Sequence, residues 1–181
     1  MKITEFKKLG KAAKRVEIAK DVIAQIKAKK YRAKANEYIT IPKSNKLKDE
    51  DNLQKKLPQI KSCSVCALGG LLMSSIKYEN NLTYGDVYNN GWTRSFIENV
   101  NVNKLFNKLF TPKQLALIEG SFEEEANNSF TNYYSREDNK VILTPEEQKK
   151  CITFYKKFRS QENRLLGIMM NIIENSGTFK P

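Results

Sequence analysis

The chain of 181 residues contains no histidine and only three cysteines, and both scarcities narrow its chemistry. Without histidine it lacks the usual general base near neutral pH and the commonest metal ligand. Any catalysis would therefore have to use Asp, Glu, Lys, Tyr, Ser or Cys. An odd number of cysteines argues against a disulfide-stapled scaffold and fits a reducing compartment, so we expect a cytoplasmic protein.

Long apolar runs and glycine-rich loops are also missing from the sequence. No apolar stretch approaches the roughly 18 residues that cross a bilayer, and the N-terminal MKITEFKKLGKAAKR has no signal-peptide h-region. We therefore expect no membrane partner. No Walker or dinucleotide-type phosphate loop occurs, and no helix-turn-helix, zinc-finger or RRM signature. We expect no metal and no cofactor, and we favour a binding role while leaving the question of enzymatic activity open.

Positive charge is present in excess and is unevenly placed. Residues 1–61 hold 18 Lys and Arg against 7 Asp and Glu, a net charge of +11, whereas residues 62–181 hold 14 against 13. Enrichment in Lys and Asn can reflect an AT-rich genome and a solvated surface. Such a bias does not by itself polarise charge along the chain, so we interpret the first third as a surface that faces a polyanion.

Apolar spacing predicts a mainly α-helical fold. A helical pattern covers residues 4–30 with a break at Gly10, and helices are expected at 11–30, 63–77 and 145–175. Thr followed by Pro marks helix starts at Thr111 and Thr144, where Thr caps the helix and Pro occupies its first position. The only extended element expected is a short strand or hairpin near 36–43.

The last helix, 145–175, contains an irregularity. Gln161 and Glu162 occupy positions where the helical spacing of this segment calls for apolar residues. This predicts either a kink in the helix or a polar group within its packed face. Gly177 follows as a natural residue just past the helix end.

The predicted architecture is one compact domain built around a central helix at 63–77, with Ser62 as its N-cap. Residues 1–61 form a basic helical segment and a surface loop that pack on a helical core of residues 62–181. Gly69 and Gly70 remove two Cβ atoms from the central helix, so another backbone or a ligand can approach it closely.

The pair Cys63 and Cys66 is open to three interpretations. Both can be small buried hydrophobic residues, since free cysteine is among the most buried residue types. They can form a redox or nucleophilic site at a helix N-terminus, where thiol pKa values fall. They can also contribute to a metal site, although only Cys151 remains as a further thiol ligand.

Two sets of residues are candidate binding sites. The first is a basic surface for nucleic acid or a nucleic-acid-bound protein, made of Lys7, Lys8, Lys11, Lys14, Arg15, Lys27, Lys29, Lys30 and Arg32. The second is a pocket for a small anionic nucleotide near Gly69, Gly70 and Arg164, because a guanidinium binds phosphate bidentately. Arg164 can equally be structural, through helix capping or an ion pair with Glu119 or Glu124.

Three segments carry a resemblance to a group of proteins: CSVCALGGLL, KQLALIEGSFE and RLLGIMMNIIENSGTFKP. Together they resemble small uncharacterised proteins of bacteria, phages and prophages with a CALG-type cysteine helix and an Asn-x-Gly-x-Phe-x-Pro tail. The resemblance implies a mobile-element setting, in which small non-enzymatic proteins often block host defence by binding a nucleoprotein or a nucleotide signal.

These observations lead to ranked hypotheses. The first is a non-enzymatic binding protein of phage or mobile-element type whose basic N-terminal surface engages nucleic acid or a nucleoprotein such as a CRISPR effector. The second is a helical pocket protein that sequesters a small anionic nucleotide. The third is a thiol-dependent enzyme that uses Cys63 or Cys66.

Overall fold

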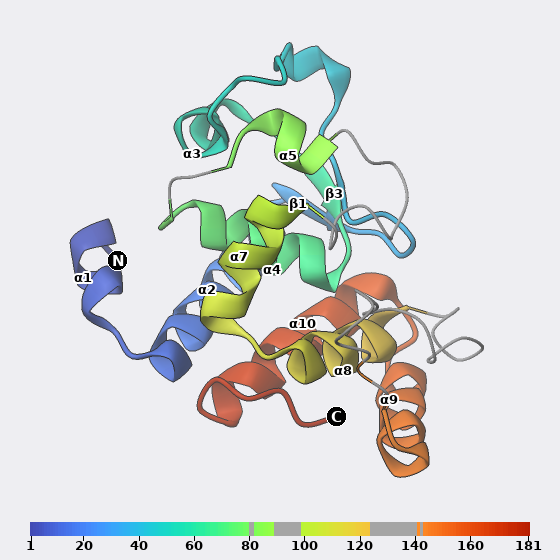
Figure 1. Cartoon of the computed structure of the whole chain (residues 1–181). Helices are drawn as coiled ribbons and strands as arrows, with labels where there is room; N and C mark the ends of the chain where they lie inside the picture. Colours follow the sequence, from blue (N-terminus) through green and yellow to red (C-terminus); the bar gives the residue numbers. More distant parts are fainter. Residues whose placement is uncertain (80–81, 89–98, 124–140, 142) are drawn as a thin grey trace.

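The computed structural model describes residues 1–79, 82–88, 99–123, 141 and 143–181 (Figure 1). Its helices are α1 (Ile3–Lys8), α2 (Lys11–Lys27), α3 (Leu53–Lys56), α4 (Ala67–Ile76), α5 (Tyr84–Tyr88), α7 (Val100–Leu109), α8 (Pro112–Phe122), α9 (Pro145–Lys157) and α10 (Gln161–Glu174). Its strands are β1 (Tyr31–Ala33), β2 (Ile39–Thr40) and β3 (Cys63–Val65), and two 3₁₀ turns are η1 (Lys43–Asn45) and η2 (Leu57–Gln59). The mainly α fold is confirmed.

The small sheet has the order β1-β3-β2. β1 runs parallel to β3, with Tyr31 opposite Cys63, and β2 runs antiparallel to β3, with Ile39 opposite Val65. β2 lies within the segment 36–43 where a strand is predicted. β1 and β3 are not predicted by the sequence pattern, since each is three residues long and depends on pairing with a distant segment.

The central helix starts later than its sequence predicts. Residues 63–65 form β3, in which Cys63 and Val65 are buried and Ser64 between them is half-buried, as expected for a strand. Helix α4 begins only at Ala67. The predicted N-cap Ser62 is therefore wrong: Cys66 caps α4, and its Sγ accepts a hydrogen bond from the Gly69 amide at 3.5 Å. The reason is the parallel pairing with β1, which holds this segment extended until residue 66.

Helix α4 forms the centre of the core. Every one of its residues is buried, and it packs against α2, α7 and α8 (Figure 1). A single hydrophobic cluster extends from Phe6 through α4 to Phe179, so the basic N-terminal third shares its core with the rest of the described chain. None of the described helices has both the length and the apolar character needed to cross a bilayer.

The predicted helix 145–175 is in fact two helices. α9 ends at Lys157, and Ser160 caps α10 by accepting a hydrogen bond from the Asn163 amide at 3.1 Å. The break lets the Phe158 ring fold back onto Gly167, where an added Cβ would lie 2.3 Å from the ring. Gln161 and Glu162 are then exposed residues of a new first turn, which explains their polarity.

The C-terminal tail is tied to three helices. Gly177 adopts φ +89°, a left-handed conformation that suits glycine after a helix end. Gln114 of α8 exchanges hydrogen bonds with the Phe179 backbone at 2.7 and 3.2 Å. The Asn171 side chain of α10 exchanges two hydrogen bonds with the Lys180 backbone, both of 2.8 Å. Arg15 of α2 donates a hydrogen bond to the Gly177 carbonyl. The tail motif is thus a structural clamp.

The surface loop predicted within residues 1–61 contains one short helix, α3. Asn52 caps it by accepting from the Lys55 amide at 3.1 Å. Leu53 and Ile60 are buried and anchor the segment to the core at two points.

Candidate nucleic-acid interface

Four lysines from two helices that are far apart in the sequence line one open concavity, which we call the lysine hollow. Lys11 and Lys14 come from α2, and Lys104 and Lys108 come from α7. The hollow has a volume of about 580 Å³. Leu9, Glu79, Asn107 and Leu109 complete its lining.

Local helix geometry places these side chains. Lys104 and Lys108 are four residues apart and Lys11 and Lys14 three apart, spacings that put each pair on one face of its helix. α2 and α7 pack against each other, which brings the two faces together. Lys14 also lies 5.4 Å from the centre of the buried Phe6 ring, and Phe6 stacks on Tyr78 with ring centres 4.1 Å apart. The hollow therefore rests on the rigid core.

The hollow keeps its positive charge. Within the described residues, no carboxylate lies within ion-pair distance of any of the four lysines. Glu79 is the one acidic residue among the described residues of the lining, which thus provide four cations against one anion. Several unpaired ammonium groups on one open surface attract polyanions and have three donors each for phosphate oxygens.

Comparison of the chain with protein-family models, with curated proteins and with solved structures found no match.

The other predicted basic residues are spread over different places. Lys7 and Lys8 are exposed at the end of α1, outside the lining of the hollow, and Lys27, Lys29 and Arg32 are exposed near the end of α2 and on β1. Lys30 lines a second concavity, between α2 and α4. The structure thus brings only Lys11 and Lys14 of the predicted set into the lysine hollow.

Arg15 is included in the predicted basic surface, but it is not a free surface cation. It is half-buried, and its guanidinium donates to the Gly177 carbonyl and, at 2.7 Å, to the Leu109 carbonyl. It also lies 5.9 Å from the Phe110 ring centre. Burial lowers the pKa of its guanidinium. Arg15 therefore links α2 to the end of α7 and to the C-terminal tail. Carbonyl groups at and beyond the end of a helix have no partner within the helix, so they need another donor.

Lys104 and Lys108 are the members that sequence reasoning missed. They lie in the part of the chain with a net charge near zero, so a charge count along the sequence does not single them out. Their spacing in VNVNKLFNKLF, in which the apolar residues Val102, Leu105, Phe106 and Leu109 are the buried ones, is the pattern that identifies them as a surface pair.

The three cysteines are free and buried. Burial raises the pKa of Cys63 to about 12 and also raises the pKa values of Cys66 and Cys151. Thiols with raised pKa values are poor nucleophiles, which favours the interpretation of these residues as core. Among the residues that the structure describes, no group of three or more Cys, Asp or Glu side chains is placed to hold a metal ion.

The residues of the predicted nucleotide pocket have structural surroundings. A Cβ at Gly69 would lie 1.6 Å from the Tyr38 carbonyl oxygen, so the close approach at Gly69 is made by the chain itself. Arg164 is buried: it donates to the Phe122 and Phe158 carbonyls at 2.9 and 3.3 Å and stacks 3.5 Å over Tyr155. Neither Gly69, Gly70 nor Arg164 lines the lysine hollow or the concavity at Lys30. A nucleotide site there stays a prediction.

Proposed function

We propose that this protein is a non-enzymatic binding protein whose lysine hollow engages the phosphate backbone of a nucleic acid, either free or within a nucleoprotein. The observation that carries this proposal is the convergence of Lys11, Lys14, Lys104 and Lys108 on one open surface, where none of them forms an ion pair with a described carboxylate. Bringing four like charges together lowers folding stability through repulsion, so a role for them in binding explains their arrangement.

The shape of the hollow favours a long polyanion over a small ligand. It is open, and four of its eight lining residues are lysines. Small-molecule sites are usually clefts or cavities that enclose most of the ligand. Lysines are point charges that bind phosphate without reading base identity, so we expect binding to depend on salt more than on sequence.

The setting of the proposal comes from the motif resemblance described above. A cytoplasmic protein of a phage or other mobile element that binds nucleic acid or a nucleoprotein would act by occupying a host defence complex such as a CRISPR effector. A pull-down from host lysate with and without nuclease treatment identifies the partner and shows whether nucleic acid bridges the contact.

The direct test of the hollow measures affinity at one salt concentration. Fluorescence anisotropy with labelled single-stranded RNA, single-stranded DNA and duplex DNA compares wild type with the Lys104→Gln/Lys108→Gln variant. The control is Lys149→Gln/Lys150→Gln, which removes the same charge from exposed positions on α9. We expect the α7 variant to lose roughly tenfold or more in affinity, because each phosphate contact is electrostatic. Equal affinities of the two variants would refute the proposal.

A further inference from the structure

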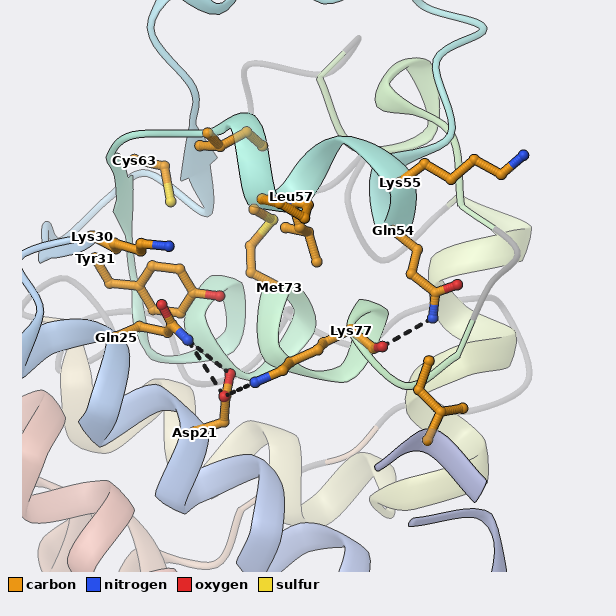
Figure 2. Close-up of a pocket in the computed structure, with 13 residues that line it drawn as sticks. Asp21, Gln25, Lys30, Tyr31, Gln54, Lys55, Leu57, Cys63, Met73 and Lys77 are labelled. Atoms are coloured by element: carbon orange, nitrogen blue, oxygen red, sulfur yellow. Dashed lines mark hydrogen bonds and ion pairs between the residues drawn. The ribbon is translucent and has the colours of Figure 1, made fainter. Parts of the chain in front are cut away.

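A second concavity lies between α2, the α3–η2 segment and α4, and its chemistry differs from that of the lysine hollow (Figure 2). It has a volume of about 480 Å³, within the range of small-molecule sites. Its apolar lining is Ile3, Tyr31, Leu57, Pro58, Ile60 and Met73. We call it the Tyr31 pocket.

The walls of the Tyr31 pocket are held by the core. β1 fixes Tyr31 opposite Cys63 of β3, and Met73 is fully buried in α4. Leu57 stands at the start of η2, between the two buried anchors Leu53 and Ile60. Because both ends of this segment are anchored, the pocket is a preformed hollow with an apolar interior.

One polar group inside the Tyr31 pocket has unused hydrogen-bonding capacity. The Tyr31 side chain is 7% exposed, and in Figure 2 its ring points into the pocket. Its hydroxyl accepts one long hydrogen bond of 3.5 Å from the buried Ser74 hydroxyl, and within the described residues it has no other. Burial raises the pKa of Tyr31, so the hydroxyl keeps its proton and can donate it.

Of the described cations that line the pocket, Lys30 is the one that points inward without an ion-pair partner. Asp21 is neutralised by Lys77 at 2.6 Å and also accepts from Gln25 at 3.3 Å. Figure 2 shows Lys30 pointing toward the interior and Lys55 pointing away from it. Lys30 has no ion pair with any described carboxylate. Among the described residues, a ligand in the pocket therefore meets apolar walls, the Tyr31 hydroxyl and the unpaired Lys30 ammonium group, beside the Asp21–Lys77 ion pair and the amides of Gln25 and Gln54.

We propose that the Tyr31 pocket binds a small, largely apolar monoanion, whose acid group is held by Lys30 and the Tyr31 hydroxyl and whose body packs on Leu57 and Pro58. A single inward cation matches a single negative charge, whereas a polyphosphate would leave charges unpaired on apolar walls. The proposal does not depend on nucleic-acid binding at the lysine hollow.

The test uses two fluorescent probes that differ in charge. 8-Anilinonaphthalene-1-sulfonate is an apolar aromatic monoanion, and N-phenyl-1-naphthylamine has the same rings without the acid. We expect saturable one-to-one binding of the sulfonate. Lys30→Gln and Tyr31→Phe should each weaken it roughly tenfold, the usual effect of losing a charge-assisted hydrogen bond, and leave the neutral probe unchanged. Lys29→Gln, an exposed neighbour outside the lining, is the control.

Filling the Tyr31 pocket gives an independent check. Leu57→Trp at the half-buried wall should abolish binding of both probes while the melting temperature stays close to wild type. Lys30→Gln changes an exposed side chain and keeps the test valid even if Tyr31→Phe fails to fold. The proposal is overturned if Lys30→Gln binds the sulfonate as tightly as wild type, if both probes bind equally, or if ATP displaces the sulfonate at lower concentration than dodecanoate does.

Discussion

Glu119 of α8 places a carboxyl group in the core, and no described residue forms an ion pair with it. One oxygen accepts a hydrogen bond from the Tyr38 hydroxyl at 2.5 Å, and the other has no partner within the described residues. Burial, and to a smaller extent the nearby Glu123 carboxylate, raise the pKa of Glu119 to about 8. The side chain is therefore protonated in the folded protein at neutral pH and ionised in the unfolded chain.

This difference between the two states makes stability depend on pH. Between the unfolded pKa of 4.5 and the folded pKa of about 8 the folded protein holds one more proton, so its stability falls as pH rises. The loss approaches about 1.4 kcal/mol per pH unit. Glu119→Gln removes this titration, so we expect its free energy of unfolding, relative to wild type, to rise steadily from pH 5 to pH 8. Urea denaturation across that range measures it, and parallel profiles would show that Glu119 does not titrate as described.

The adjacent glycines Gly69 and Gly70 have different surroundings, so their alanine substitutions can be compared directly. An added Cβ at Gly69 would lie 1.6 Å from the Tyr38 carbonyl oxygen, whereas at Gly70 the nearest atoms are Val22 and Val65 methyl groups at 3.5 and 3.6 Å. We expect Gly69→Ala to cost about 3 kcal/mol or more, because backbone must move. Gly70→Ala should be neutral or stabilise by up to about 1 kcal/mol through helix propensity. Equal effects in thermal melts would contradict the close contact.

At the scale of elements, the parts that sequence predicts are those whose cause is local. Thr111 and Thr144 cap α8 and α9 by accepting from the amides of Gln114 and Glu147, all within three residues. The parts that were missed depend on distant contacts. β3 is extended because it pairs with β1, and α9 ends because Phe158 turns back onto Gly167. Neither cause leaves a periodic pattern in its own segment.

The start of α4 yields a prediction that separates the two nearby cysteines. Cys63 faces the core from β3, so Cys63→Ser should lower stability by about 1–3 kcal/mol through burial of a hydroxyl. Cys66 occupies the N-cap, where serine is a preferred residue and a shorter hydrogen bond to the Gly69 amide offsets the same penalty. We expect Cys66→Ser to be the milder substitution in chemical denaturation. The reverse order would mean that Cys66 is not the capping residue.

At the scale of the whole molecule, folding redistributes the charge that the sequence shows. The excess of positive charge in residues 1–61 predicts a basic surface, and Lys11 and Lys14 do line the lysine hollow. The fold then adds Lys104 and Lys108 and withdraws Arg15 into contacts with the Gly177 and Leu109 carbonyls. Which lysines meet depends on how α2 packs against α7, and a charge count along the chain contains no information on that packing.

The central claim is that the lysine hollow meets phosphates, and the salt dependence of nucleic-acid binding tests it most directly. A variant with Lys11, Lys14, Lys104 and Lys108 all changed to Gln leaves Arg15 in place and removes the repulsion between the lysines, so we expect its melting temperature to be no lower than that of wild type. If each lysine contacts one phosphate, the slope of log K against log salt should fall by about 2.8–3.6 relative to wild type. An unchanged slope, with affinity retained, would contradict the account.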